Sequence, residues 1–218
     1  MAKVQYSIEP SKSFPSASLA SFINLEHWNN NPNFASNYWE GSKKMERYLF
    51  LDIDGVLNTM RYSNYLTDHG EDDTDEDGAL FDPEAVANLE TIIKNVPDVK
   101  IIISSTWRFK GWDWMNRLWE KRHLPEKIYG FTPALEFVRF QDVVSKDYSE
   151  SVYPYGTRGL EIGEWLRLNK RRNPLVYRYV IIDDEDDFPS EYNDHVILTN
   201  PQYGITKETA LQVIENLL

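Results

Sequence analysis

The chain has 218 residues, of which 35 are acidic and 23 are basic, so its formal net charge at pH 7 is −12. This length suits one sizeable domain with a buried core. The acidity argues against a polybasic surface that coats nucleic acid or anionic membranes. The absence of cysteine excludes disulfides, thiolate nucleophiles and cysteine-held metals, which leaves oxygen and imidazole as metal ligands.

The first 47 residues differ in character from the rest of the chain. Residues 1–47 are rich in Ser and Asn, carry scattered aromatic residues and show no helical or strand periodicity. We expect an irregular arm there, followed by one domain over residues 48–218. No apolar stretch has the length of a signal peptide core or a membrane-spanning helix, so we expect a cytoplasmic protein that does not bind membranes.

Strands and helices alternate in the predicted domain. The apolar run YLFLDIDGVLN, residues 48–58, predicts a strand that ends in carboxylates and a glycine. An acidic loop and then a helix over residues 81–96 follow, the helix with Pro83 in its first turn. The later elements, in chain order, are a strand in VKIIISSTW (99–107), helices over 111–122 and 158–170, a strand over 177–184 and a helix over 206–218.

This alternation predicts an α/β fold with a doubly wound parallel sheet and right-handed crossovers. In such sheets the chemistry lies beyond the carboxyl ends of the strands. The polar residues that follow the three predicted strands are Asp52 and Asp54, Ser104 and Ser105, and Asp183 and Asp184.

The two acidic pairs predict a metal site. Asp52 and Asp54 are two residues apart, so their side chains face the same way in an extended segment, and Gly55 permits a sharp turn beside them. Asp183 and Asp184 would complete an oxygen-only ligand set, which suits Mg²⁺ bound to a substrate phosphate. The alternative interpretation is that each pair is a solvated strand end or loop.

Several motifs resemble those of the haloacid dehalogenase superfamily of phosphohydrolases. LFLDIDGVLN resembles its first motif, the IIISS strand end its second, and IIDDEDDF its fourth. The basic residue of the third motif is best matched by Arg158 in TRGLEIGEWL, with the more distant Lys146 as the alternative. The resemblance covers residues 48–218.

The resemblance implies a role for each matched residue. Asp52 would be the nucleophile that forms an aspartyl-phosphate, and Asp54 the general acid and then the base. Mg²⁺ would be bound by Asp52, the Asp54 carbonyl, Asp183 and Asp184, and the phosphate oxygens by Arg158 with Ser104 or Ser105, the choice of hydroxyl staying open.

The chain between the first strand and the helix at 81–96 is too short for a large cap domain. ISSTWR, GFTPAL and RGLEIGEWL also resemble the short-capped superfamily members that accompany RNA-repair proteins. We therefore expect a Mg²⁺-dependent phosphomonoester phosphatase with a minimal cap, acting on a nucleotide or another small phosphorylated metabolite. The alternative substrate is a polynucleotide end, on which Trp107 and Trp114 are candidates to stack.

Residues 73–84, DTDEDGALFDPE, match the calcium-loop pattern, with Asp73, Asp75, Asp77 and Glu84 as ligands. The preceding RYSNYLTDHGED shows no helical stripe, so the entering helix of an EF-hand is not expected. A non-catalytic protein that binds Ca²⁺ through this loop is the competing hypothesis, and a mobile acidic loop is the plainer one. Residues 71–77 and 183–187 hold much of the acidic excess, which weakens the charge argument against nucleic-acid ends.

Overall fold

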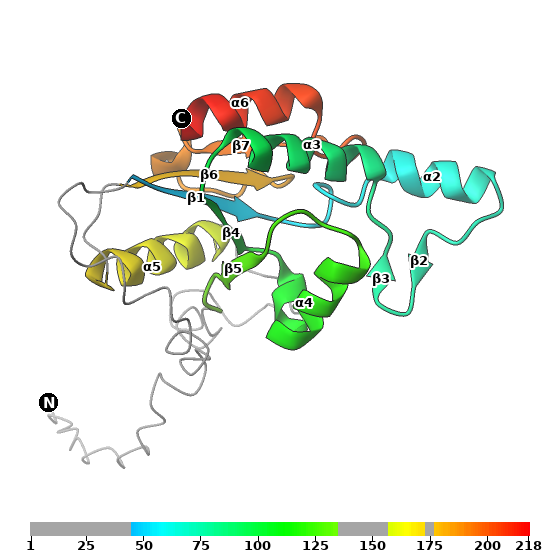
Figure 1. Ribbon diagram of the computed structural model, residues 1–218, viewed down its shortest axis with the longest axis horizontal. Helices are drawn as coiled ribbons and strands as arrows, with labels where there is room; N and C mark the ends of the chain where they lie inside the picture. Colours follow the sequence, from blue (N-terminus) through cyan, green and yellow to red (C-terminus); the bar gives the residue numbers. More distant parts are fainter. Residues whose placement is uncertain (1–44, 135–156, 173–176) are drawn as a thin grey trace, which may run out of the picture. The chain divides into compact units, whose positions relative to one another are not determined.

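The computed structural model describes residues 45–134, 157–172 and 177–218 (Figure 1). The predicted arm, residues 1–47, lies outside these ranges except for residues 45–47. Strand β1, Glu46–Leu51, begins in those last residues of the arm. The alternative third-motif residue Lys146 also lies outside the described residues. All described residues belong to one unit of the chain, Lys43–Leu218.

A five-stranded parallel sheet forms the centre of this unit, in the order β5-β4-β1-β6-β7. Strand β1 is central, pairing with β4, Val99–Ile103, on one side and β6, Tyr177–Asp183, on the other. The two edge strands, β5 (Ile128–Phe131) and β7 (Val196–Leu198), are short and were not predicted from the sequence. The predicted α/β fold with a parallel sheet is confirmed.

Helices cover both faces of the sheet, because alternate side chains of the buried strands point to opposite sides. Leu49 and Leu51 of β1 join the core cluster that also contains residues of helices α3, α4 and α6. Tyr48 and Phe50 face the other way, against Trp165 of α5, with ring centroids 4.9 and 5.3 Å away. Figure 1 shows α3 and α6 on one side of the sheet and α5 on the other. The bounds of these helices are α3 Pro83–Asn95, α4 Trp112–Lys121, α5 Thr157–Arg172 and α6 Lys207–Leu217.

The segment between β1 and α3 corrects the expectation of an irregular acidic loop. It contains helix α2, Met60–Asp68, and an antiparallel hairpin of β2 (Thr74–Asp75) and β3 (Gly78–Ala79). The side chain of Thr59 caps α2 by accepting a hydrogen bond from the backbone of Tyr62. Only Leu66 of this helix is buried, so the sequence carries no apolar stripe that would have revealed it. The insertion after β1 is small, as expected.

Two short 3₁₀-helices complete the described structure, Thr106–Lys110 after β4 and Ser190–Tyr192 between β6 and β7. None of the helices in the described ranges combines the length and the apolar character needed to cross a membrane.

Candidate active site

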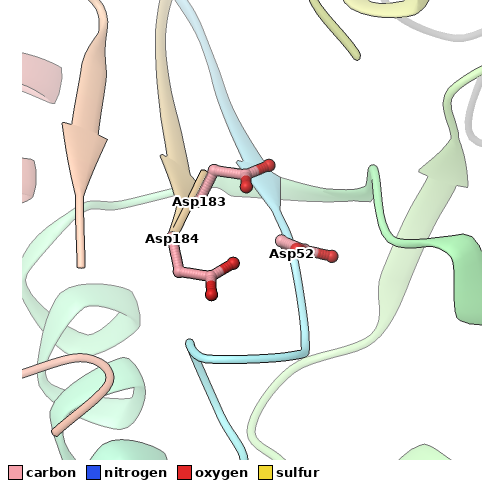
Figure 2. Close-up of side chains that lie close together, drawn as sticks. All are labelled: Asp52, Asp183 and Asp184. Carbon is pink, nitrogen blue, oxygen red and sulfur yellow. The ribbon is translucent and has the colours of Figure 1, made fainter. Parts of the chain in front are cut away.

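Three carboxylates meet at the carboxyl edge of the sheet. Asp52 directly follows β1, Asp183 ends β6, and Asp184 follows it. Their carboxylate oxygens lie within 4.8 Å of one another, and Figure 2 shows the three side chains together. The register of β1 on β6 continues past the strand, because the Asp52 amide donates to the Ile182 carbonyl at 3.0 Å. The parallel pairing of the two central strands therefore brings these side chains together.

Burial and mutual repulsion disfavour the charged form of this group. Burial, with the charge of Asp52 added, raises the pKa of Asp183 well above its usual range. The same two causes raise the pKa of Asp184 to about 6. Asp183 Oδ2 is buried and accepts no hydrogen bond within the described part of the chain. Such a group is destabilising unless a cation neutralises it.

Arg158 supplies part of the missing positive charge. It lies in the first turn of α5, and its Nη1 donates to Asp52 Oδ1 at 3.1 Å, while its Nε lies 3.7 Å from Asp183 Oδ2. Burial alone would lower the pKa of Arg158, but the charges of Asp52 and Asp183 outweigh it and raise that pKa. The structure thus places the predicted third-motif residue beside the predicted nucleophile.

The two serines after β4 have different surroundings. Ser105 caps the following 3₁₀-helix, because its Oγ accepts a hydrogen bond from the Trp107 amide at 3.4 Å. The Ser104 Oγ is buried and has no hydrogen-bond partner among the described residues. The Ser104 carbonyl, by contrast, accepts a hydrogen bond from Arg158 Nη1. Of the two candidate hydroxyls, that of Ser105 caps a helix, whereas that of Ser104 makes no hydrogen bond to the described residues.

A buried ion pair between Arg108 and Glu161 braces these strand ends and was missed by the sequence analysis. Arg108 Nη2 lies 2.5 Å from Glu161 Oε2, and both side chains are almost fully buried. The Arg108 guanidinium also donates to the carbonyls of Ser104, Ser105 and Thr132, at 2.9, 2.7 and 3.2 Å. It thereby joins the ends of β4 and β5 to helix α5, which carries Arg158. The partners are 53 residues apart, so no local pattern indicated them.

The Asp54 carboxylate does not join the three-carboxylate group, which corrects the expectation that it faces the same way as Asp52. The strand ends at Leu51, and the chain turns back at once, with the Leu57 amide donating to the Ile53 carbonyl at 2.8 Å. Strand alternation therefore no longer applies at Asp54. Its Oδ1 instead accepts from Asn58 Nδ2 at 2.7 Å and its Oδ2 from Trp107 Nε1 at 2.8 Å.

Gly55 keeps the turn close to the carboxylates. Its φ is +62°, and a Cβ at this position would lie 2.3 Å from Asp184 Oδ2. Thr199, after β7, donates to the Gly55 carbonyl at 3.0 Å and so fixes the turn over the end of β6. A residue with a side chain would fill the space beside Asp184 and strain the backbone.

These observations fit a divalent cation. Asp52, Asp183 and Asp184 offer oxygen ligands at one point, and one buried oxygen of Asp183 has no hydrogen-bond donor among the residues that the structure describes. A hard cation such as Mg²⁺ prefers such oxygens and would relieve the repulsion between the carboxylates. Asp54 contributes no carboxylate oxygen to this group and would bind a cation only through its carbonyl.

The comparison with known protein families agrees with the geometry. The family model described as the HAD domain in Swiss Army Knife RNA repair proteins matches residues 48–210, which is most of the chain. The chain belongs to this family. No curated protein and no solved structure matches it significantly. The fold is thus a HAD-type α/β fold; membership of the family supports phosphatase activity in general, and HAD domains typically use a divalent metal.

The acidic hairpin of this HAD domain brings together only part of the predicted calcium-ligand set, within a cluster that could hold a metal ion. Asp75, Glu76 and Asp77 lie together, but Asp73 and Glu84 are not part of that cluster. Asp73 accepts a hydrogen bond from Ser63, and Glu84 pairs with Arg61 at 2.7 Å. Two bases, one in α4 and one at its C-cap, offset part of the charge of this cluster: Lys121 pairs with Asp75, Glu76 and Asp77, and Arg122 with Asp75. The four predicted ligands therefore do not converge.

Proposed function

We propose that the protein is a Mg²⁺-dependent phosphomonoester phosphatase that works through an aspartyl-phosphate on Asp52. The observation that carries the proposal is the meeting of Asp52, Asp183 and Asp184 with Arg158 at the carboxyl edge of the sheet. Phosphoryl transfer requires mainly positioning and charge neutralisation, which this group of side chains would provide with a divalent cation bound. The three carboxylates would hold Mg²⁺, and the bound ion would supply positive charge to the phosphoryl oxygens.

The chain's own residues divide the remaining work. Arg158 and the Ser104 hydroxyl, which has no partner within the described ranges, would hold the phosphoryl oxygens while an Asp52 oxygen forms a bond to phosphorus. Asp54 would give its proton to the leaving oxygen as the ester bond breaks. It would then take a proton from the water that attacks the aspartyl-phosphate, which releases phosphate and restores Asp52.

For the substrate we propose a nucleotide or another small phosphorylated metabolite. A second candidate, a phosphorylated polynucleotide end, is favoured by the family description, which refers to RNA repair proteins. A comparison of mononucleotides with 3′- and 5′-phosphorylated oligonucleotides as substrates separates the two. The cytoplasmic location is part of the same proposal, and the absence of cysteine is compatible with it.

The test of this function uses the full chain and 4-nitrophenyl phosphate. We expect turnover that requires Mg²⁺, stops on addition of a chelator and is lost in Asp52→Asn. A Glu90→Gln variant changes an exposed carboxylate of helix α3 and serves as the matched control, with turnover close to that of the wild type. The proposal is wrong if turnover is absent in the wild type or is undiminished in Asp52→Asn.

A further inference from the structure

Both oxygens of the Asp54 carboxylate are already engaged by side-chain donors. Asn58 Nδ2 lies 2.7 Å from one oxygen and Trp107 Nε1 lies 2.8 Å from the other. Asn58 belongs to the same turn, since its Oδ1 accepts from the Gly55 amide at 2.9 Å. Trp107 comes from a different element, the 3₁₀-helix after β4. The orientation of this exposed carboxylate is thus set by two separate parts of the fold.

The Trp107 indole is itself held in place. Its backbone amide bonds to Ser105 Oγ, so the residue belongs to the same loop as the serines of the site. The ring packs against Phe81 and Trp114, with centroids 5.9 and 6.0 Å away. The Lys110 ammonium lies 5.1 Å from the ring centroid. An indole packed in this way presents its N–H, which is always a donor, in one direction.

The β2–β3 hairpin touches the far edge of the same indole. A Cβ built on Gly78 would lie 3.0 Å from Trp107 Cη2, so the hairpin backbone approaches the ring closely. Ion pairs hold the hairpin beside α4, among them Arg122 Nη1 to Asp75 Oδ2 at 2.7 Å. Trp107 therefore lies between the hairpin and the Asp54 carboxylate.

We propose that Trp107 is the positioning residue for Asp54: its indole N–H, together with the Asn58 amide, turns the carboxyl group so that its proton reaches the leaving oxygen. This inference rests on the proposed function, in which Asp54 is the general acid. The two donors each use one lone pair of the carboxyl oxygens, which leaves the proton a restricted set of positions. The close approach of Gly78 makes this orientation depend on the hairpin.

The test compares leaving groups that differ in their need for a proton. Trp107→Phe keeps an aromatic ring and removes the N–H. The alkoxide that leaves from glycerol 2-phosphate needs a proton, whereas the 4-nitrophenolate that leaves from 4-nitrophenyl phosphate hardly does. We therefore expect kcat for glycerol 2-phosphate to fall at least about tenfold and kcat for 4-nitrophenyl phosphate to change little. Trp114→Phe, which alters the neighbouring indole, is the control and is expected to affect both esters equally.

Gly78→Ala provides a second variant that leaves Trp107 itself unchanged. It is expected to show the same selective loss, because the added Cβ would lie 3.0 Å from the indole and a side chain at φ +121° would strain the hairpin backbone beside it. Circular dichroism and thermal melting verify that the variants fold. An equal loss for both esters in Trp107→Phe, or no loss for either, overturns the inference and leaves the proposed function standing. A wild-type protein that hydrolyses neither ester refutes the proposed function instead.

Discussion

Replacement of Glu161 by Gln tests whether the buried ion pair with Arg108 holds the site together. The substitution keeps the size of the side chain and removes its charge. The Arg108 guanidinium, whose side chain is 3% exposed, would then lie in the interior without a carboxylate partner from the described part of the chain. Its three carbonyl acceptors do not neutralise the charge. Breaking one side of a buried pair costs about 3–5 kcal/mol of unfolding free energy.

The assay is urea denaturation followed by circular dichroism, with Glu164→Gln as the matched control on the same helix. Glu164 pairs with Arg167 at 2.5 Å, but the Arg167 side chain is 46% exposed, so the loss there is expected to stay below about 1 kcal/mol. A free energy of unfolding of Glu161→Gln within about 1 kcal/mol of the wild-type value would refute the reasoning. Removing the carboxylate from a buried ion pair is expected to cost more than removing one from a surface pair.

Three further predictions follow from the carboxylate group. Arg158→Met lowers kcat/KM for 4-nitrophenyl phosphate by about 10²-fold or more, because a charged donor to the phosphoryl oxygens is lost; activity near the wild-type value contradicts this role. Gly55→Ala weakens the thermal stabilisation by Mg²⁺, because its Cβ would lie 2.3 Å from Asp184 Oδ2. Gly70→Ala is the control in the same melting assay: Gly70 also has a positive φ, but a Cβ there would meet nothing within 4 Å, so the effect of Mg²⁺ stays unchanged. The folded-state pKa values of Asp183 and Asp184 are raised, to about 6 for Asp184. The folded protein therefore binds more protons than the unfolded chain. The metal-free protein is expected to lose stability as the pH rises from about 4 through 6 and above. The rise in melting temperature on adding Mg²⁺ is then larger at pH 8 than at pH 5, and a rise independent of pH contradicts the assignment.

The parts of the fold with strong local patterns were predictable from sequence. The runs at Leu49–Leu51 and Ile101–Ile103 are apolar because both faces of a central parallel strand are buried, and they carried the strand predictions. Pro83 and Thr206 marked the starts of α3 and α6 correctly. Helix α2 and the edge strand β7 were missed, because a largely exposed helix and a three-residue strand have no apolar period to detect.

The site was predictable as far as strand ends determine it. Asp52 and Ser104 follow buried strands and Asp183 ends one, so the rule for parallel sheets indicated them. The position of Arg158 came from the family resemblance. The orientation of Asp54 was not predictable, because its two donors, Asn58 and Trp107, come from a turn and from a distant loop. Contacts of this kind depend on how the elements pack, which no local pattern records.

The calcium-loop pattern shows the opposite case, in which a strong local match was overruled by packing. The chain folds this segment into a hairpin whose acidic cluster is paired with Lys121 and Arg122. The Arg122–Asp75 pair lowers the pKa of the Asp75 carboxyl far below its usual range, the hydrogen bond from Arg122 being the largest cause. Basic side chains at the C-terminal end of α4 thus pair with carboxylates that the pattern assigned to a metal.

The most direct test of the central claim is to trap the phosphorylated enzyme. The full chain is mixed with Mg²⁺ and 4-nitrophenyl phosphate, quenched in acid during turnover and digested, and the peptides are analysed by mass spectrometry. The account predicts a phosphoryl group on the peptide that contains Asp52, absent when Mg²⁺ is chelated and absent in Asp52→Asn. A phosphoryl group found on a different residue, or rapid turnover in Asp52→Asn, would contradict it.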